Sequence, residues 1–258
     1  MDLKIMNNIG YRVKLNDYLD TKTHYKSFLE EYFELFNAIE VKINKYLINC
    51  NDFDNYIKYL LDTYREKVSF HFNKSLLNVG LNEKEKMIID YLTAQKYSIS
   101  CISHLSPNIM DIDDIESIEQ LSYKFNKNTI LTLENPETKE DILTYLENIS
   151  EVFHKLEEEN IKLNLCIDWG HILINNRDID LVFNKIRKED LLKYVSEYHI
   201  HNIKDGCDHQ PIYNGEIDCN EIYKLISKHN DKARIILECE VNKMQQDGLD
   251  NIKLLTKK

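Results

Sequence analysis

The sequence has few of the residues that usually separate domains. It contains only 3 proline and 6 glycine residues in 258 positions, and they are not gathered into a linker. No charge block or low-complexity tract divides the chain into halves. A single α/β barrel domain commonly has about 250 residues. We therefore expect residues 1–258 to form one domain.

Signals for a membrane or for secretion are also missing. The N-terminal sequence MDLKIMNNIG has no basic flank followed by an apolar core. No apolar run approaches the ~18 residues that span a bilayer. The six cysteines include no C-x-x-C pair, which favours reduced thiols. These absences predict a cytoplasmic protein without a membrane partner.

Positive charge is in deficit. Lys and Arg together number 33 against 44 Asp and Glu, which gives a formal net charge of −11. A chain of this kind has no broad basic surface for phosphate backbones, which argues against nucleic acid as a partner. The hydrophobic fraction of 43% is sufficient for a substantial core.

Two periods alternate along the chain. Short β-branched or aromatic runs predict strands, and the longer stretches between them have the apolar spacing of helices. The predicted strands lie at residues 2–6, 38–43, 67–72, 97–103, 128–134, 162–168, 197–203 and 234–239. The predicted helices lie at residues 24–36, 53–66, 82–95, 138–158, 179–195 and 218–230. Thr138 and Asp218 each precede an acidic residue by three positions, a pattern typical of an N-cap.

Eight strands that alternate with helices predict a (β/α)8 TIM barrel, because βα units wind right-handed into a parallel sheet. An open doubly wound sheet is the competing fold. Its usual dinucleotide site is missing here, since no G-x-G-x-x-G follows the first predicted strand. The closed barrel is therefore the preferred fold.

The ends of the predicted strands carry residues that bind metals. These residues are His71, His104, Glu134, Asp168, His171, His199, His201 and Glu238. In a TIM barrel the carboxyl ends of the strands form the active site, so side chains from distant segments can converge there. A mixed set of carboxylates and imidazoles suits a divalent ion such as Mn, Zn, Co, Fe or Mg. The pattern predicts a metal site at this end of the barrel.

The succession of these segments resembles the xylose isomerase-like TIM barrels. This superfamily holds sugar and sugar-phosphate isomerases and epimerases, inositol-catabolism enzymes and endonuclease IV. The resemblance runs from Leu3 to about Glu240, through AIEVKI, SFHF, ISHLSP, LTLEN, IDWGH, HIHN and IILE. Its most specific parts are the Asp-x-x-His of Asp168 and His171 and the segment 199–218. That segment is similar to the family's H-x-H-D-N-x-G…D-x-H-x-P-x-G-x-G-x-I-D run.

The resemblance implies that Glu134, Asp168, His199 and Glu238 bind a catalytic divalent metal, with one ion expected and up to three possible. In the isomerase and epimerase branch, Glu134 and Glu238 also transfer protons, a metal-stabilised enediolate forms, and His171 binds substrate. The implied function is isomerisation or epimerisation of a small sugar, sugar phosphate or related polyol. The resemblance is also compatible with a homodimer.

The endonuclease IV branch supplies the alternative function, a multi-zinc phosphoester hydrolase. In that branch His71, His104 and Glu134 would bind one ion, the four residues above a second, and His171 with His209 a third. Two features depart from that branch. The chain has only five arginines and few glycines for gripping a duplex, and Asp208 directly precedes His209 where the family has an intervening residue.

Several assignments remain open from the sequence. His199 and His201 share a strand face, so spacing cannot decide which one is the seventh-strand ligand, although the family alignment favours His199. Either Asp205 or Asp208 is a candidate to join the site. The substrate-binding candidates are His171, His201, Trp169, Lys204 and Glu40. For Trp169, packing in the barrel rim is an equal alternative to lining a sugar pocket.

Overall fold

A computed structural model describes most of the chain. The described residues are 8–13, 25–43, 53–72, 99–105, 129–137, 141–174, 178–239 and 244–256, with isolated positions between 86 and 123. The predicted strand at residues 2–6 and most of the predicted helix at residues 82–95 lie outside the described residues.

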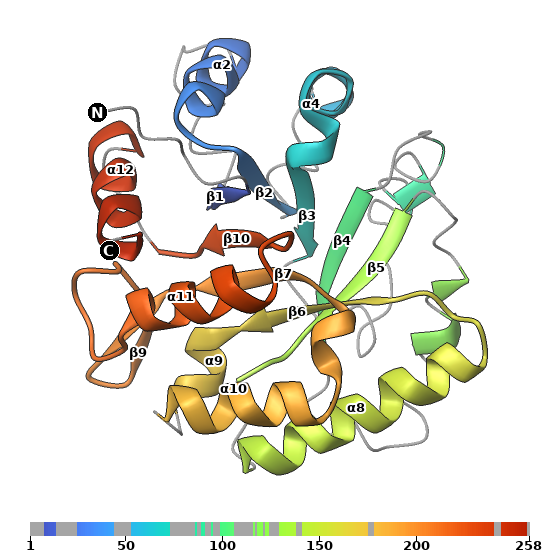
Figure 1. The fold of residues 1–258 in the computed structure, drawn as a ribbon. Coiled ribbons are helices and arrows are strands. Elements are labelled where there is room, and N and C mark those ends of the chain that lie inside the picture. Colours follow the sequence, from blue (N-terminus) through green and yellow to red (C-terminus); the bar gives the residue numbers. More distant parts are fainter. Residues whose placement is uncertain are drawn as a thin grey trace.

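Eight parallel strands in the described part of the chain close into a barrel (Figure 1). They are β1 (Ile9–Val13), β2 (Ala38–Ile43), β3 (Val68–Phe72), β4 (Ile99–His104), β5 (Thr129–Glu134), β6 (Asn164–Asp168), β7 (Val195–Ile200) and β10 (Arg234–Leu237). Each strand pairs in parallel with its two neighbours, and β1 closes the barrel against β10. The predicted TIM barrel is confirmed.

The first barrel strand is β1 at Ile9–Val13, which the sequence analysis did not identify as a strand. Its sequence, IGYRV, does not predict a strand, because Gly10 and Arg12 interrupt the apolar run. Gly10 is required by packing, since a Cβ at this position would lie 1.7 Å from the carbonyl oxygen of Ala38 on β2. The close approach of the two backbones explains why a poor strand former occupies a barrel strand.

The predicted seventh strand, residues 197–203, is divided in the structure. The barrel strand β7 ends at Ile200, and a two-stranded antiparallel hairpin follows, formed by β8 (Asn202–Lys204) and β9 (Cys207–Gln210). The side chain of Asn202 supports this hairpin by accepting hydrogen bonds from the backbone N–H groups of Ile203 and Ile217. The hairpin rises from the carboxyl end of the barrel.

Helices surround the barrel, as Figure 1 shows. The helices are α2 (Tyr25–Leu35), α4 (Phe53–Tyr64), α8 (Ile142–Glu158), α9 (Trp169–Leu173), α10 (Ile179–Lys188), α11 (Cys219–His229) and α12 (Met244–Leu255), and the 3-10 turns are η1 (Arg65–Lys67) and η2 (Leu191–Lys193). Asp218 caps α11 as predicted, because its side chain accepts from Glu221 N. The cap of α8 is Asp141, whereas the predicted Thr138 lies outside the described residues. No helix in the described part of the chain is long and apolar enough to cross a membrane.

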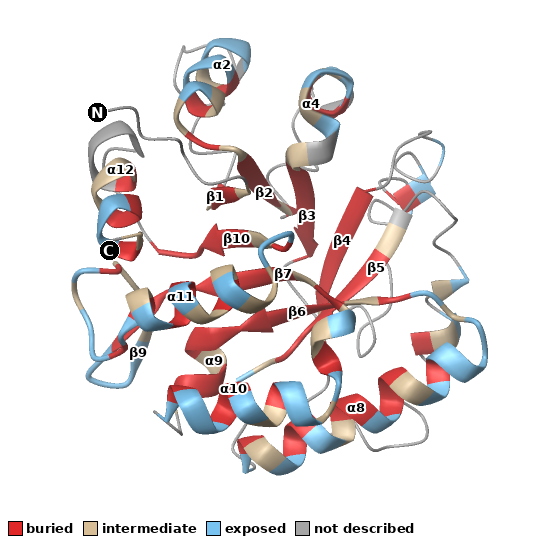
Figure 2. Ribbon diagram, in the orientation of Figure 1, coloured by how far each residue is buried: buried red, intermediate tan, exposed pale blue. Residues whose placement is uncertain are grey.

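The apolar core lies between the strands and the helices. The barrel strands are buried almost throughout, while the helices alternate between buried and exposed faces (Figure 2). Outward-facing strand residues such as Phe70, Leu133 and Leu165 belong to this core and have no exposed surface. The inward-facing residues are different in character, since many of them are polar or charged. The interior of the barrel therefore forms the candidate site.

Candidate metal and active site

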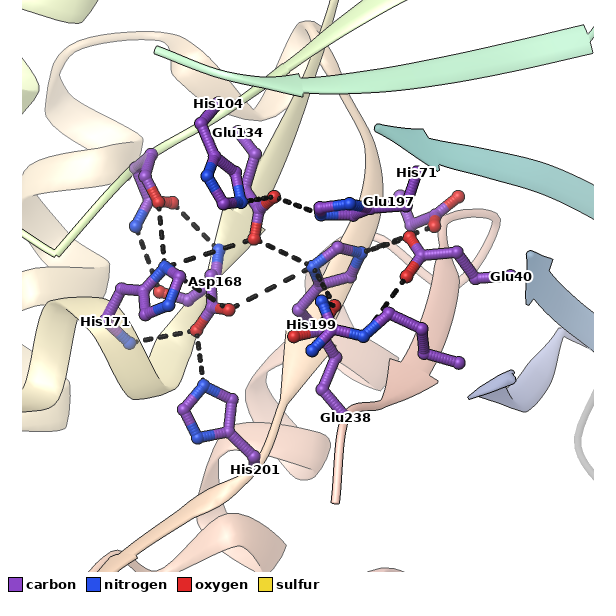
Figure 3. Close-up of polar contacts among 12 residues, drawn as sticks. Glu40, His71, His104, Glu134, Asp168, His171, Glu197, His199, His201 and Glu238 are labelled. Carbon is purple, nitrogen blue, oxygen red and sulfur yellow. Dashed lines mark hydrogen bonds and ion pairs between the residues drawn. The ribbon is translucent and has the colours of Figure 1, made fainter. Parts of the chain in front are cut away.

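Alternate residues of each strand point into the barrel, and the strand register sets them at matching heights. His104 pairs in register with Glu134 across β4 and β5, and Asp168 pairs with His199 across β6 and β7. These are the last or nearly the last residues of their strands, as the sequence analysis expected. Figure 3 shows the side chains meeting at one point.

His199 occupies the centre of the cluster. Its Nδ1 lies 3.0 Å from Oε1 of Glu134, 3.0 Å from Oε1 of Glu238 and 4.0 Å from Oδ2 of Asp168. One donor atom from each of these four residues lies within 4.8 Å of the others, and all four side chains are buried. This is the set that the family resemblance implied, and its donors match those of a divalent metal site.

A β-bulge in β7 brings His199 to this place. The pairing with β6 shifts between Leu165 and Cys166, so that Val195 pairs with Leu165 while Glu197 pairs with Cys166. Ser196 is therefore the extra residue. Because side chains alternate with period two, one added residue moves every later side chain to the opposite face. The bulge sets both Glu197 and His199 toward the barrel interior.

A second group of donors shares Glu134. Its Oε2 lies 2.7 Å from Nε2 of His71 and 2.9 Å from Nε2 of His104, while its Oε1 faces His199. His71 is buried, whereas the side chain of His104 is 32% exposed. Glu134 thus has one oxygen for each of two groups of imidazoles, which is the arrangement of a bridging carboxylate.

A third group joins His171, His201 and His209, whose nitrogens also lie within 4.8 Å of one another. The rings of His201 and His209 stack with 4.4 Å between centroids, and the backbone N–H of His209 donates to His201 Nδ1. Asp208 contacts His209 Nδ1 at 3.0 Å. Asp205 instead lies at the turn of the hairpin, with its backbone N–H bonded to Glu216. Of the two candidate aspartates, the structure brings Asp208 to the site.

His201 contacts Asp168 of the central donor set but is not itself a member of that set. Its Nε2 lies 3.1 Å from Oδ1 of Asp168, and its ring packs against Gly170, where a Cβ would lie 2.0 Å from the imidazole. The other oxygen of Asp168, Oδ2, is buried, accepts no hydrogen bond among the described residues and lies 3.4 Å from Nδ1 of His171. A buried carboxylate oxygen that accepts no hydrogen bond is costly, so this oxygen fits a bound cation.

Charge interactions hold the cluster in ionised form. Burial alone raises the pKa of Glu134, but the neighbouring imidazoles of His199, His104 and His71 outweigh burial and hold this pKa well below its usual range. Burial likewise raises the pKa of Glu238, but Arg12 and His199 outweigh burial and hold this pKa well below its usual range. Burial lowers the pKa of His199, but the surrounding carboxylates raise it well above its usual value. Ionised carboxylates are the form that metals bind.

Three of the predicted substrate-binding residues have different surroundings. Trp169 is fully buried and stacks on Phe183 of α10, so the structure favours the packing alternative. Lys204 is exposed on the hairpin, where its Nζ donates to Asn214. Glu40 is fully buried and contacts Nε2 of His199 at 2.9 Å, on the side of the ring opposite the central carboxylates. Glu40 also forms, with His71, His199 and Glu238, a further group of donor atoms within 4.8 Å of one another. The substrate-binding roles of these residues stay predictions.

Three residues of the cluster were missed by the sequence analysis. Arg12 contacts Oε1 of Glu238 at 2.5 Å, and it was overlooked because its strand was not identified. Asn135 accepts from Asp168 N and donates to Asp168 O, and its position directly after Glu134 was an available signal. Glu197 contacts His199, and the period-two spacing of EYHIH placed it on the same face.

The barrel is similar to two solved sugar epimerases. The D-psicose 3-epimerase of Clostridium cellulolyticum H10, solved with D-tagatose, is 14% identical, and the match covers 96% of this chain and 89% of that one with a TM-score of 0.59. An L-ribulose 3-epimerase is 13% identical over 98% of this chain and 88% of that one, with a TM-score of 0.62. No protein-family model and no curated protein matches the sequence. The similarity confirms the (β/α)8 TIM barrel as the fold.

Proposed function

We propose that the protein is a divalent-metal-dependent isomerase or epimerase of a small sugar, sugar phosphate or related polyol. The observation that carries this proposal is the convergence of Glu134, Asp168, His199 and Glu238 at the carboxyl end of the barrel. Two sugar 3-epimerases share the fold, which supports the reaction class. The barrel fold without these four residues would not support the reaction class, since one fold hosts many chemistries.

The four residues would hold the ion through three carboxylates and Nδ1 of His199. A divalent cation held there would polarise adjacent carbonyl and hydroxyl oxygens and would stabilise the negative charge that develops when a carbon-bound proton is removed. Glu134 and Glu238 are also the proposed proton-transfer pair. One glutamate, as the carboxylate, would take the proton from carbon, and the other, after taking up a proton from solvent, would donate it to carbon from the opposite face.

The direct test is isotope exchange combined with metal analysis. The protein is loaded with Mn²⁺ or Co²⁺ and incubated in D₂O with free ketopentoses and ketohexoses and their phosphates. We expect one equivalent of metal and deuterium at the carbon next to the carbonyl, with a new sugar formed. Bound metal without exchange into any of these sugars would reject the proposed reaction while leaving the metal site in place.

A multi-zinc phosphoester hydrolase is the second candidate. The specific observation in its favour is that Oε2 of Glu134 meets His71 and His104 while Oε1 faces His199. An isomerase with a single ion has no evident need for these two imidazoles. Metal content per chain in wild type and His71→Ala separates the two functions. Two or three equivalents in wild type, with loss in the variant and cleavage of a phosphodiester or abasic oligonucleotide, would favour hydrolysis.

A further inference from the structure

Glu197 is a buried carboxylate with no role in the proposed metal set. It lies on β7 two residues before His199, has no exposed surface, and belongs to none of the groups of donors that could hold an ion. Burying a carboxylate without a partner is strongly unfavourable. The contacts of Glu197 therefore indicate what it does.

Two side chains from other strands hold the carboxylate of Glu197 in place. Arg234 Nε, at the start of β10, lies 2.7 Å from Oε2, and Ser69 Oγ on β3 donates to Oε1 at 3.0 Å. Arg234 also donates to the carbonyl of Val68 at 3.2 Å, which fixes the guanidinium in turn. The charge of Glu197 is thus paired with Arg234, and the carboxylate is fixed in one orientation.

Glu197 also contacts the imidazole of His199. Nε2 of this ring lies 3.5 Å from Oε1 of Glu197 and 2.9 Å from Oε2 of Glu40. Nδ1 of the same ring faces Glu134 and Glu238. In the proposed metal set Nδ1 is the ligand atom, so Nε2 is the nitrogen left for Glu197 and Glu40 to orient.

We propose that Glu197 is a positioning residue for His199. Anchored by Arg234 and Ser69, it holds the Nε2–H side of the ring and directs the Nδ1 lone pair toward Glu134, Asp168 and Glu238. This inference rests on the metal site of the proposed function. It adds to that site a chain of contacts inside the barrel, in which Arg234 contacts Glu197 and Glu197 contacts His199.

The expected consequence is a change in metal affinity without direct contact to the metal. Groups that orient a histidine ligand typically contribute about 10- to 100-fold to metal affinity. Glu197→Gln keeps the size of the side chain but removes its charge, so the ring of His199 loses one of the two carboxylates that face Nε2. We expect Co²⁺ binding to weaken by about 10-fold or more.

Co²⁺ is the probe because its visible absorption reports the ligand geometry, independently of activity. The dissociation constant is measured by competition with a chelator in wild type, Glu197→Gln and Ser100→Ala. Ser100 is the matched control, since it is a buried polar residue whose Oγ lies 2.6 Å from Thr132 Oγ1 and which is in none of the donor groups. We expect weaker binding and a shifted spectrum in Glu197→Gln alone. Unfolding of the metal-free proteins is followed in parallel.

Three results would overturn the inference. One is an unchanged affinity and spectrum in Glu197→Gln, and another is an equal loss of affinity in Ser100→Ala. If wild type binds no Co²⁺, the proposed function fails together with the inference, which distinguishes this case from the first two. Should Glu197→Gln not fold, Ser69→Ala removes one anchor of Glu197 and is expected to weaken Co²⁺ binding several-fold, again with a spectral shift. An unchanged affinity in Ser69→Ala would then count against the inference.

Discussion

The two faces of the barrel sheet differ sharply. The outer face of β5 presents Leu131 and Leu133 to the helices, while its inner face presents Thr132 and Glu134 to the barrel interior. All four residues are almost completely buried. The same strand therefore contributes to an apolar core on one side and to a polar cluster on the other.

This contrast indicates a division of labour between the faces. Apolar burial stabilises a fold by roughly 25 cal/mol per Å², and the outer face supplies it in large amount. Buried charges contribute little net stability, even when they are paired. The interior of a TIM barrel is more often filled with branched apolar residues. Here the apolar outer face stabilises the fold, so the interior can hold ionised groups. Substitutions on the outer face should mainly change stability, and substitutions on the inner face should mainly change activity.

The largest effect is expected at the inner face. Glu134→Gln should lower kcat/KM by about 10³-fold or more, because the residue is both a proposed metal ligand and a proposed proton-transfer group. Circular dichroism should be unchanged. The measurement is kcat/KM on the sugar found by isotope exchange, with metal content determined on the same sample. Activity above a tenth of the wild-type value would remove Glu134 from the mechanism.

The neighbouring outer residue should behave in the opposite way. Leu133→Ala leaves a cavity in the apolar core and should cost about 2–5 kcal/mol in the free energy of unfolding. Activity per folded molecule should stay near that of wild type. Urea denaturation measures the free energy of unfolding. Titration of the active sites with metal gives the concentration of folded molecules, to which the measured activity is then referred. A loss of activity without a loss of stability would show that the faces are not independent.

The pH dependence of the metal-free protein should reflect the inner face. The pKa values of Glu134 and Glu238 are lowered from 4.5, so their contribution is present above pH 4.5 and is lost as pH falls through the folded-state values. The pKa of His199 is raised from 6.5, so its contribution is present below pH 6.5 and is lost as pH rises through the folded-state value. Stability should be greatest between about pH 4.5 and 6.5. Urea midpoints measured both within and well outside this range test the prediction, and a maximum above about pH 8 would contradict it.

A smaller effect is expected at Gly170, which packs against the ring of His201. An added Cβ would lie 2.0 Å from the ring of His201, so Gly170→Ala should displace this imidazole from Asp168. We expect activity to fall by about 10-fold, because small displacements near reacting groups are costly. The double variant Gly170→Ala with His201→Ala is the control. If His201 transmits the effect, the added methyl should cost nothing further once the ring is removed.

The smallest effect is expected on the outer surface. Asp218→Ala removes the cap of α11, in which the side chain accepts from Glu221 N at 3.0 Å. The expected cost is about 1 kcal/mol of stability with unchanged kcat/KM. Thermal unfolding and steady-state kinetics measure both quantities. Asp218→Asn, which can still accept this hydrogen bond, should restore most of the stability.

Much of the fold and part of the cluster were predictable from local patterns. The period-two alternation in TILTLE and the ligand-type residues at strand ends were sufficient to predict a barrel and to place Glu134, Asp168, Glu238 and a histidine of the seventh strand near one another. The chain does this because alternation assigns each side chain to a face, and parallel strands place their carboxyl ends together. Both properties can be derived from short segments of sequence. The preference for His199 over His201 came from the family resemblance.

Other features were decided only by contacts between distant strands. The bulge at Ser196 depends on how β7 pairs with β6, and it determines that Glu197 and His199 face inward. Arg12 enters the cluster because β1 closes the barrel against β10. Glu40 contacts the far side of the His199 ring, which only the packing of β2 and β7 around one interior could establish. The sequence by itself determined which face each side chain could occupy within a regular strand. Register, bulges and closure come from pairing across the whole barrel, and the tertiary structure therefore decided which of those side chains touch.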